Sequence, residues 1–111
     1  MSRTPLNASI QKIATTTLTL LDYIVPPSTV STAFLVLTNT SENILDIEVY
    51  INDGVTDFLI VRNKIPSGIG KDWIVKEIST QKLNAGFTIK VKSDSLNAFN
   101  AFLSVSEISN N

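Results

Sequence analysis

The sequence predicts an all-β protein, a single antiparallel β-sandwich of about eight strands with jelly-roll or immunoglobulin-like topology. Three observations predict this fold class. Runs rich in Ile, Val, Thr and Phe recur along the whole chain, and no segment keeps the 3.6-residue apolar period of a helix. Turn signals separate the runs at spacings of roughly 8–12 residues, as in antiparallel sandwiches. With 111 residues, the chain has room for one domain and one core.

The first elements follow from apolar runs and from prolines. We predict a flexible N-terminal arm at residues 1–8 and a sandwich domain at residues 9–111. Strands are predicted at Ile10–Ala14 and Leu18–Val25. Pro26 and Pro27 end the second of these, because proline cannot donate to a central ladder.

The next strand is predicted at Val30–Asn39, before a polar turn from Thr38 to Asn43. Its apolar residues run almost without interruption from Phe34 to Leu37. Such a run is typical of a strand that is covered on both faces.

The clearest alternation in the chain follows that turn. Leu45, Ile47, Val49 and Ile51 share one face of a strand, and Asp46, Glu48 and Tyr50 share the other. Asn52-Asp53-Gly54 then predicts a tight hairpin, because these residue types tolerate the positive φ of primed turns. The chain is expected to return antiparallel through Phe58–Ile65.

The remaining strands are separated by turns. Pro66-Ser67-Gly68 ends the returning strand, Trp73–Ile78 is predicted as a further strand, and Asn84-Ala85-Gly86 as a turn. Phe87, Ile89 and Val91 are expected to point inward and Thr88, Lys90 and Lys92 outward. After a turn at Asp94–Asn97, Phe99–Ile108 closes the sheet with Ala101, Leu103 and Val105 on one face.

Composition argues against catalysis. The chain has no histidine and no cysteine, which removes the commonest general base, Ser-His-Asp triads, disulfides and thiolate metal sites. Asp46 and Glu48 share a strand face, whereas a glycosidase needs two carboxylates that converge from different elements. Asp53 and Asp57 flank a turn without the spacing of a calcium loop. We therefore expect no enzyme, no cofactor, and no catalytic, cofactor-binding or metal site.

The four glycines are better explained as turn residues than as a phosphate-cradling loop: Gly54, Gly68, Gly70 and Gly86. Two aromatic residues are candidates for contact with a ligand or partner. Tyr50 falls on the polar face of its strand, where it could stack on a sugar or anchor an interface. Trp73 is more readily explained as core or interface than as a sugar platform.

Charge and hydropathy limit the partners. The formal net charge is −1, and Lys90 with Lys92 is the nearest approach to a basic patch, so no nucleic-acid partner is expected. No apolar run reaches the roughly 20 residues that span a bilayer, and the first residues lack the apolar stretch of a signal peptide. We expect synthesis in the cytoplasm and no membrane partner. A charged fraction of only 17% predicts neutral outer faces that pack against copies or partners.

Four groups of landmarks recur in order between about residues 16 and 108. They are Ile24-Val25-Pro26-Pro27 with Asn39-Thr40-Ser41; Ile47–Ile51 leading to Asp53-Gly54; Ile65-Pro66-Ser67-Gly68 with Leu83-Asn84-Ala85-Gly86 and Ile89-Lys90-Val91; and Val105-Ser106-Glu107-Ile108. In this order they resemble the small β-sandwich accessory virion proteins of tailed bacteriophages. The chain departs from that pattern at Ser28-Thr29, where glycine is frequent, and at Phe87, where aspartate is frequent.

The resemblance implies a structural virion component: a capsid decoration or cement protein, a head-fibre protein, or a small neck, collar or tail protein. It implies a homo-oligomer that contacts other capsid, neck or tail subunits and uses no cofactor, with an arm that orders on a neighbour. The candidate contact residues are Tyr50 and the margins of the Val30–Asn39 strand. The alternative is a free-standing carbohydrate-binding or adhesin-like module.

Overall fold

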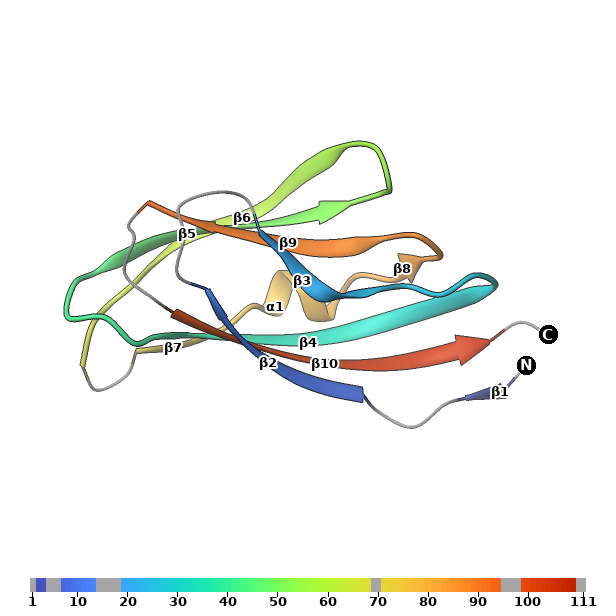
Figure 1. Cartoon of the computed structure of the whole chain (residues 1–111), viewed down its shortest axis with the longest axis horizontal. Helices are drawn as coiled ribbons and strands as arrows, with labels where there is room; N and C mark the ends of the chain where they lie inside the picture. Colours follow the sequence, from blue (N-terminus) through green and yellow to red (C-terminus); the bar gives the residue numbers. More distant parts are fainter. Residues whose placement is uncertain (1, 4–6, 14–18, 69–70, 95–98, 110–111) are drawn as a thin grey trace.

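Two antiparallel β-sheets pack face to face in the computed structural model, which describes residues 2–3, 7–13, 19–68, 71–94 and 99–109 (Figure 1). These residues form ten strands and one short helix. The strands are β1 (Ser2–Arg3), β2 (Asn7–Ile13), β3 (Thr19–Ile24), β4 (Thr29–Asn39), β5 (Leu45–Asn52), β6 (Asp57–Ile65), β7 (Asp72–Ile74), β8 (Leu83–Asn84), β9 (Thr88–Ser93) and β10 (Phe99–Ser109), and the helix is α1 (Lys76–Ser79). The predicted all-β sandwich is confirmed.

The strand pairing is that of a jelly roll. In the first sheet, β10 lies between β4 and the pair β1 and β2, and β7 and β8 pair with the other side of β4. The second sheet has the order β3-β9-β5-β6. The early strands pair with the late ones in reverse order: β2 with β10, β3 with β9, β4 with β8 and β7, and β5 with β6. One long hairpin wound into two sheets gives this order, which decides between the two predicted topologies.

The core lies between the two sheets and consists of the inward residues that the alternation predicts. Leu35 and Leu37 of β4 and Ile47 and Val49 of β5 are fully buried. The predicted inward residues Ala101, Leu103 and Val105 on β10 and Ile89 and Val91 on β9 are also buried. Phe87, before β9, is partly buried against the core, and Thr88, which was predicted to point outward, is buried. The two-residue period of these strands thus accounts for most of the core.

Strand β4 differs from the prediction that both of its faces are covered. Its residues alternate along its length between buried and more exposed positions. Phe34, in the middle of the apolar run, is 43% exposed. Within the described chain, only one face of β4 has a second sheet packed on it, so the continuous apolar run leaves an apolar outer face.

The predicted strand Trp73–Ile78 is also wrong in its second half. The strand β7 ends at Ile74, and the helical turn α1 follows. Val75 and Ile78 are both fully buried, and their spacing of three residues places them on one side of a helical turn but on opposite faces of a strand. Burial of both side chains therefore favours the helical turn.

The predicted arm is partly paired in the structure. Ser2 and Arg3 pair with Ser109 and Ile108, and Asn7–Ile13 run antiparallel to β10. The boundary predicted at residue 8 therefore falls inside β2. Pairing satisfies backbone groups along the side of β10 that β4 does not occupy. Residues 1, 4–6, 14 and 18 lie outside the described residues.

The turns use the residues that the sequence singles out. Gly54, Gly68 and Gly86 all have positive φ, a conformation that glycine adopts without a steric penalty. Gly70 and most of the predicted turn at Asp94–Asn97 lie outside the described residues. The returning strand β6 carries a bulge that the sequence did not predict: Val61 pairs with Val49 and Leu59 with Tyr50, so Ile60 is the extra residue.

Candidate interaction surfaces

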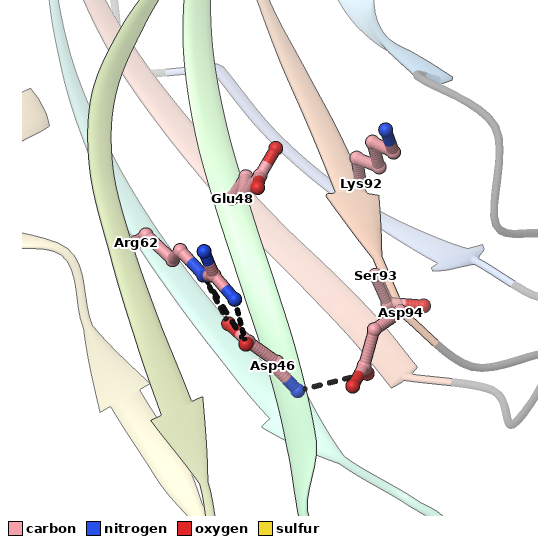
Figure 2. Close-up of a pocket in the computed structure, with 6 residues that line it drawn as sticks. All are labelled: Asp46, Glu48, Arg62, Lys92, Ser93 and Asp94. Carbon is pink, nitrogen blue, oxygen red and sulfur yellow. Dashed lines mark hydrogen bonds and ion pairs between the residues drawn. The ribbon is translucent and has the colours of Figure 1, made fainter.

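The outer face of the second sheet is charged. We call it the charged face and define it by the outward residues Asp46, Glu48, Tyr50, Arg62, Lys64, Lys90 and Lys92, whose pairings place them on one side of β5, β6 and β9. Part of this face forms an open groove of about 470 Å³ (Figure 2). Asp94, after β9, closes one end of the groove, where its carboxylate accepts the Asp46 backbone N–H at 3.0 Å.

The two carboxylates that the sequence places on this face have separate partners. Arg62 binds Asp46 in a bidentate manner, with Nε donating to Oδ1 at 2.9 Å and Nη2 to Oδ2 at 2.5 Å. These bonds lower the pKa of Asp46 below its usual range. Glu48 accepts the Tyr50 hydroxyl at 2.5 Å, which raises the pKa of Tyr50. Asp46 is thus held ionised by its cation, the opposite of what a general acid requires.

The acidic residues at the β5–β6 turn bind backbone and side-chain donors of the turn itself. The Asp53 carboxylate accepts the N–H groups of Val55 at 2.9 Å and Thr56 at 2.8 Å, which lowers its pKa. Asp57 accepts the Asn52 amide at 2.7 Å and pairs with Lys90 at 3.1 Å. No group of three or more His, Cys, Asp or Glu side chains that could hold a metal occurs among the described residues.

The two aromatic candidates are not arranged as a sugar platform. Trp73 pairs with the inward residue Leu37 and packs against the core. Tyr50 is half-buried, and its hydroxyl is bonded to Glu48. Trp73 is therefore partly buried at the edge of the core, and Tyr50 belongs to the charged face.

A polar cluster joins the two sheets. The Tyr23 hydroxyl of β3 donates to Glu107 Oε2 of β10 at 2.5 Å and lies 2.5 Å from Ser31 Oγ of β4. Since the single phenolic proton goes to Glu107, the Ser31 hydroxyl donates to Tyr23. Burial and the bond to Glu107 raise the pKa of Tyr23 to about 12. The cluster satisfies buried polar groups and ties β3 to the first sheet.

The outer face of the first sheet differs from the charged face in kind. We call it the neutral face and define it by the ten outward residues of β4 and β10: Val30, Thr32, Phe34, Val36, Thr38, Asn100, Phe102, Ser104, Ser106 and Ile108. None of these ten carries a charge. Phe102, Val36 and Ile74 of β7 pair in one row across three strands, and Ile74 is 51% exposed.

A second apolar surface lies at the end of the β5–β6 hairpin, which rises away from the rest of the molecule (Figure 1). We call it the hairpin tip and define it by Val55, Phe58 and Leu59, which are 90%, 50% and 54% exposed. Phe58 pairs with Ile51, and Leu59 with Tyr50. Because successive residues of a strand point to opposite faces, both faces of β6 present an apolar side chain here.

The sequence analysis missed both surfaces as sites. The signal for the neutral face was present in the uncharged alternate residues from Val30 to Thr38 and from Asn100 to Ile108. Both margins of β4 carry hydrogen-bonded neighbouring strands, β10 on one side and β7 and β8 on the other.

Comparison with protein-family models, curated proteins and solved structures gives no match for this chain. Among the described residues, no helix is long and apolar enough to cross a membrane.

Proposed function

We propose that this chain is a structural component of a bacteriophage virion, made in the host cytoplasm and assembled into the particle. It is a capsid decoration or head-fibre protein, or a small neck or tail accessory protein. It acts through protein–protein contacts made in many copies, and its partners are further copies of itself and other capsid, neck or tail subunits.

The observation that carries this proposal is the presence of two distinct surfaces on opposite sheets, the uncharged neutral face with the exposed Phe34 and the apolar hairpin tip. The neutral face covers the outside of the first sheet, and the hairpin tip ends the second. Exposed apolar patches on soluble proteins commonly mark sites of association. A subunit that joins two kinds of neighbour needs two such surfaces, whereas a free-standing binding module needs one.

The fold and the positions of the aromatic side chains agree with this proposal. Jelly rolls are frequent in viral capsid proteins and also in lectins, so the fold alone supports both predicted functions by analogy. The two aromatic residues that the sequence offers to a sugar are not free platforms, because Trp73 packs against the core and the Tyr50 hydroxyl is bonded to Glu48. We therefore favour the virion component.

The test is the composition of particles from the phage that encodes this chain. Purified virions should contain the chain in a fixed ratio to the major capsid subunit, as measured by quantitative mass spectrometry. Particles that lack the chain after purification would overturn the proposal.

A pair of variants tests the hairpin tip. We expect the double variant Val55→Ser, Leu59→Ser to fold normally, because both side chains are at least half exposed, but to be depleted from particles. The matched control is Ile44→Ser, which makes the same kind of change at a side chain that is 63% exposed and outside both surfaces. The control should enter particles at the wild-type ratio.

A further inference from the structure

We propose that the neutral face packs in solution against the neutral face of a second copy of this chain, about a two-fold axis parallel to the strands. This proposal rests on the proposed function, because it assumes that the neutral face makes protein–protein contacts. It makes a second copy of this chain the partner of the neutral face and leaves the hairpin tip free for a different protein.

The distribution of charge favours a second copy. In a two-fold contact the same patch meets itself, so charged residues near the centre would face like charges. None of the ten residues of the neutral face is charged, whereas six of the seven that define the charged face are. Of the two sheet faces, the neutral face is therefore the one suited to contact with itself.

The register of the first sheet gives the direction of the axis. Lys12, Asn100, Thr38 and Asp72 occupy one cross-strand row, with Lys12 and Asp72 at its two ends. An axis parallel to the strands turns each row onto itself, end for end. It therefore brings the Lys12 position of each copy over Asp72 of the other, which pairs opposite charges at the rim.

The same operation matches the apolar row. Phe102, Val36 and Ile74 pair across β10, β4 and β7, and Ile10 of β2 takes the next register position beside Phe102. Rotation about this axis places Phe102 over Val36 and Ile74 over the Ile10 position. Apolar positions then meet apolar positions, with the charged positions at the rim, as in stable interfaces.

The area is at the lower limit for a specific dimer. The four strands across this face differ in length: β4 and β10 have 11 residues each, β2 has 7 and β7 has 3. Each residue occupies about 3.4 Å along its strand and about 4.8 Å across it, or roughly 16 Å². The footprint is then about 500 Å² on each copy and about 1,000 Å² in total, the smallest area expected of a biological interface.

Coverage by a second sheet also accounts for the sequence of β4. The continuous run from Phe34 to Leu37 predicts a strand buried on both faces, and in one chain Phe34 is 43% exposed. A second copy stacked at the usual sheet separation of about 10 Å would cover Phe34 and Ile74.

The test is the mass of the purified chain by size-exclusion chromatography with light scattering. At about 100 µM, two orders of magnitude above a micromolar dissociation constant, the wild type should be a dimer. Phe34→Glu should be a monomer with unchanged circular dichroism, and Ile74→Glu is a second variant at an exposed position. Lys92→Gln on the charged face changes the net charge by the same single unit and should remain a dimer.

Three outcomes would overturn this proposal. The wild type could be a monomer, both single variants Phe34→Glu and Ile74→Glu could dimerise like the wild type, or Lys92→Gln could be a monomer. Because the mass is measured without particles, it is independent of the virion proposal. A monomer that is present in virions refutes the second copy alone, and a dimer that is absent from virions refutes the virion role alone.

A charge exchange tests the axis. Asp72→Lys should weaken the dimer by about fivefold, since two rim pairs become repulsive, and the double variant Lys12→Asp, Asp72→Lys should restore the wild-type dissociation constant. Within one chain the two positions lie three strand spacings apart, about 14 Å, so restoration reports a contact between copies. A double variant as weak as Asp72→Lys would refute this axis.

Discussion

Replacement of Asn39 by alanine should be among the most destabilising changes of a polar residue in this protein. Asn39 ends β4 and is fully buried. Its amide donates to the carbonyl of Asn43 at 2.7 Å and to that of Ile65 at 3.0 Å. Its side-chain oxygen accepts the backbone N–H of Ser41 at 2.8 Å and the Ser41 hydroxyl at 2.7 Å. One side chain thus closes the β4–β5 turn and joins it to β6.

The expected loss in the free energy of unfolding follows from where these four hydrogen bonds lie. The bond to Ile65 is buried, so its loss leaves a carbonyl without that donor, at a cost of about 1–3 kcal/mol. The other three involve Ser41 and Asn43 at the more exposed turn, where water replaces part of each bond, at about 0.5 kcal/mol apiece. We expect Asn39→Ala to lower the free energy of unfolding by about 3 kcal/mol, a large share of the roughly 5–15 kcal/mol of a typical domain.

The assay is urea unfolding followed by the fluorescence of Trp73, the single tryptophan. A loss of about 3 kcal/mol lowers the urea midpoint by about 1–3 M. The control is Asn43→Ala, the same substitution in the same turn, because Asn43 contributes its backbone carbonyl and its side chain is exposed. If both variants lose equal stability, or if Asn39→Ala stays within about 0.5 kcal/mol of the wild type, the argument from the buried amide is refuted.

Three further predictions concern titration and turn geometry. The pKa of Tyr23 is raised to about 12, so the stability that this residue contributes below the ordinary tyrosine pKa is lost as the pH rises through the folded value. In urea titrations, Tyr23→Phe should therefore lose less stability than the wild type between pH values of about 10 and 12. The lowered pKa of Asp46 beside Arg62 has the opposite sign, with stability present above the ordinary aspartate pKa of about 3.9 and lost as the pH falls through the folded value. Asp46→Asn should thus show a shallower fall in urea midpoint below about pH 4, and a slope equal to that of the wild type would contradict this. Gly54→Ala should lower the free energy of unfolding by about 1 kcal/mol or more. The cost comes from the φ of +104° and not from crowding, because the added Cβ would meet only a carbonyl oxygen at 3.9 Å. Unchanged stability by thermal unfolding would show that this turn relaxes.

Much of the fold could be predicted because burial in a sandwich imposes a period of two residues. The alternation from Leu45 to Ile51 and from Ala101 to Val105 assigned both the strands and their inward faces. The hairpin after Asn52 was predicted at the right place, but its loop has four residues, 53–56, in place of a tight primed turn, and Gly54 alone in this loop has positive φ. These features depend only on neighbours along the chain.

The features that the sequence left open or did not indicate depend on pairs that are distant along the chain. The choice of jelly roll over immunoglobulin-like topology is set by long-range pairs such as β2 with β10, which no local pattern encodes. The bulge at Ile60 exists only relative to β5. Asn39 was read as a turn residue, and its role became evident only once Ile65, 26 residues later, lay against it.

The neutral face combines both kinds of information. The uncharged outward positions of β4 and of β10 are each visible in the sequence, yet neither strand alone indicates a surface. Because Phe34 pairs with Ser104 and Val36 with Phe102, the two sets of uncharged residues form one continuous face. A residue that contacted only solvent would cost little as Lys or Glu, so uncharged outward positions on two adjacent strands are best explained by a partner. The run from Phe34 to Leu37, which predicts a strand covered on both faces, agrees with the proposed pairing of two neutral faces.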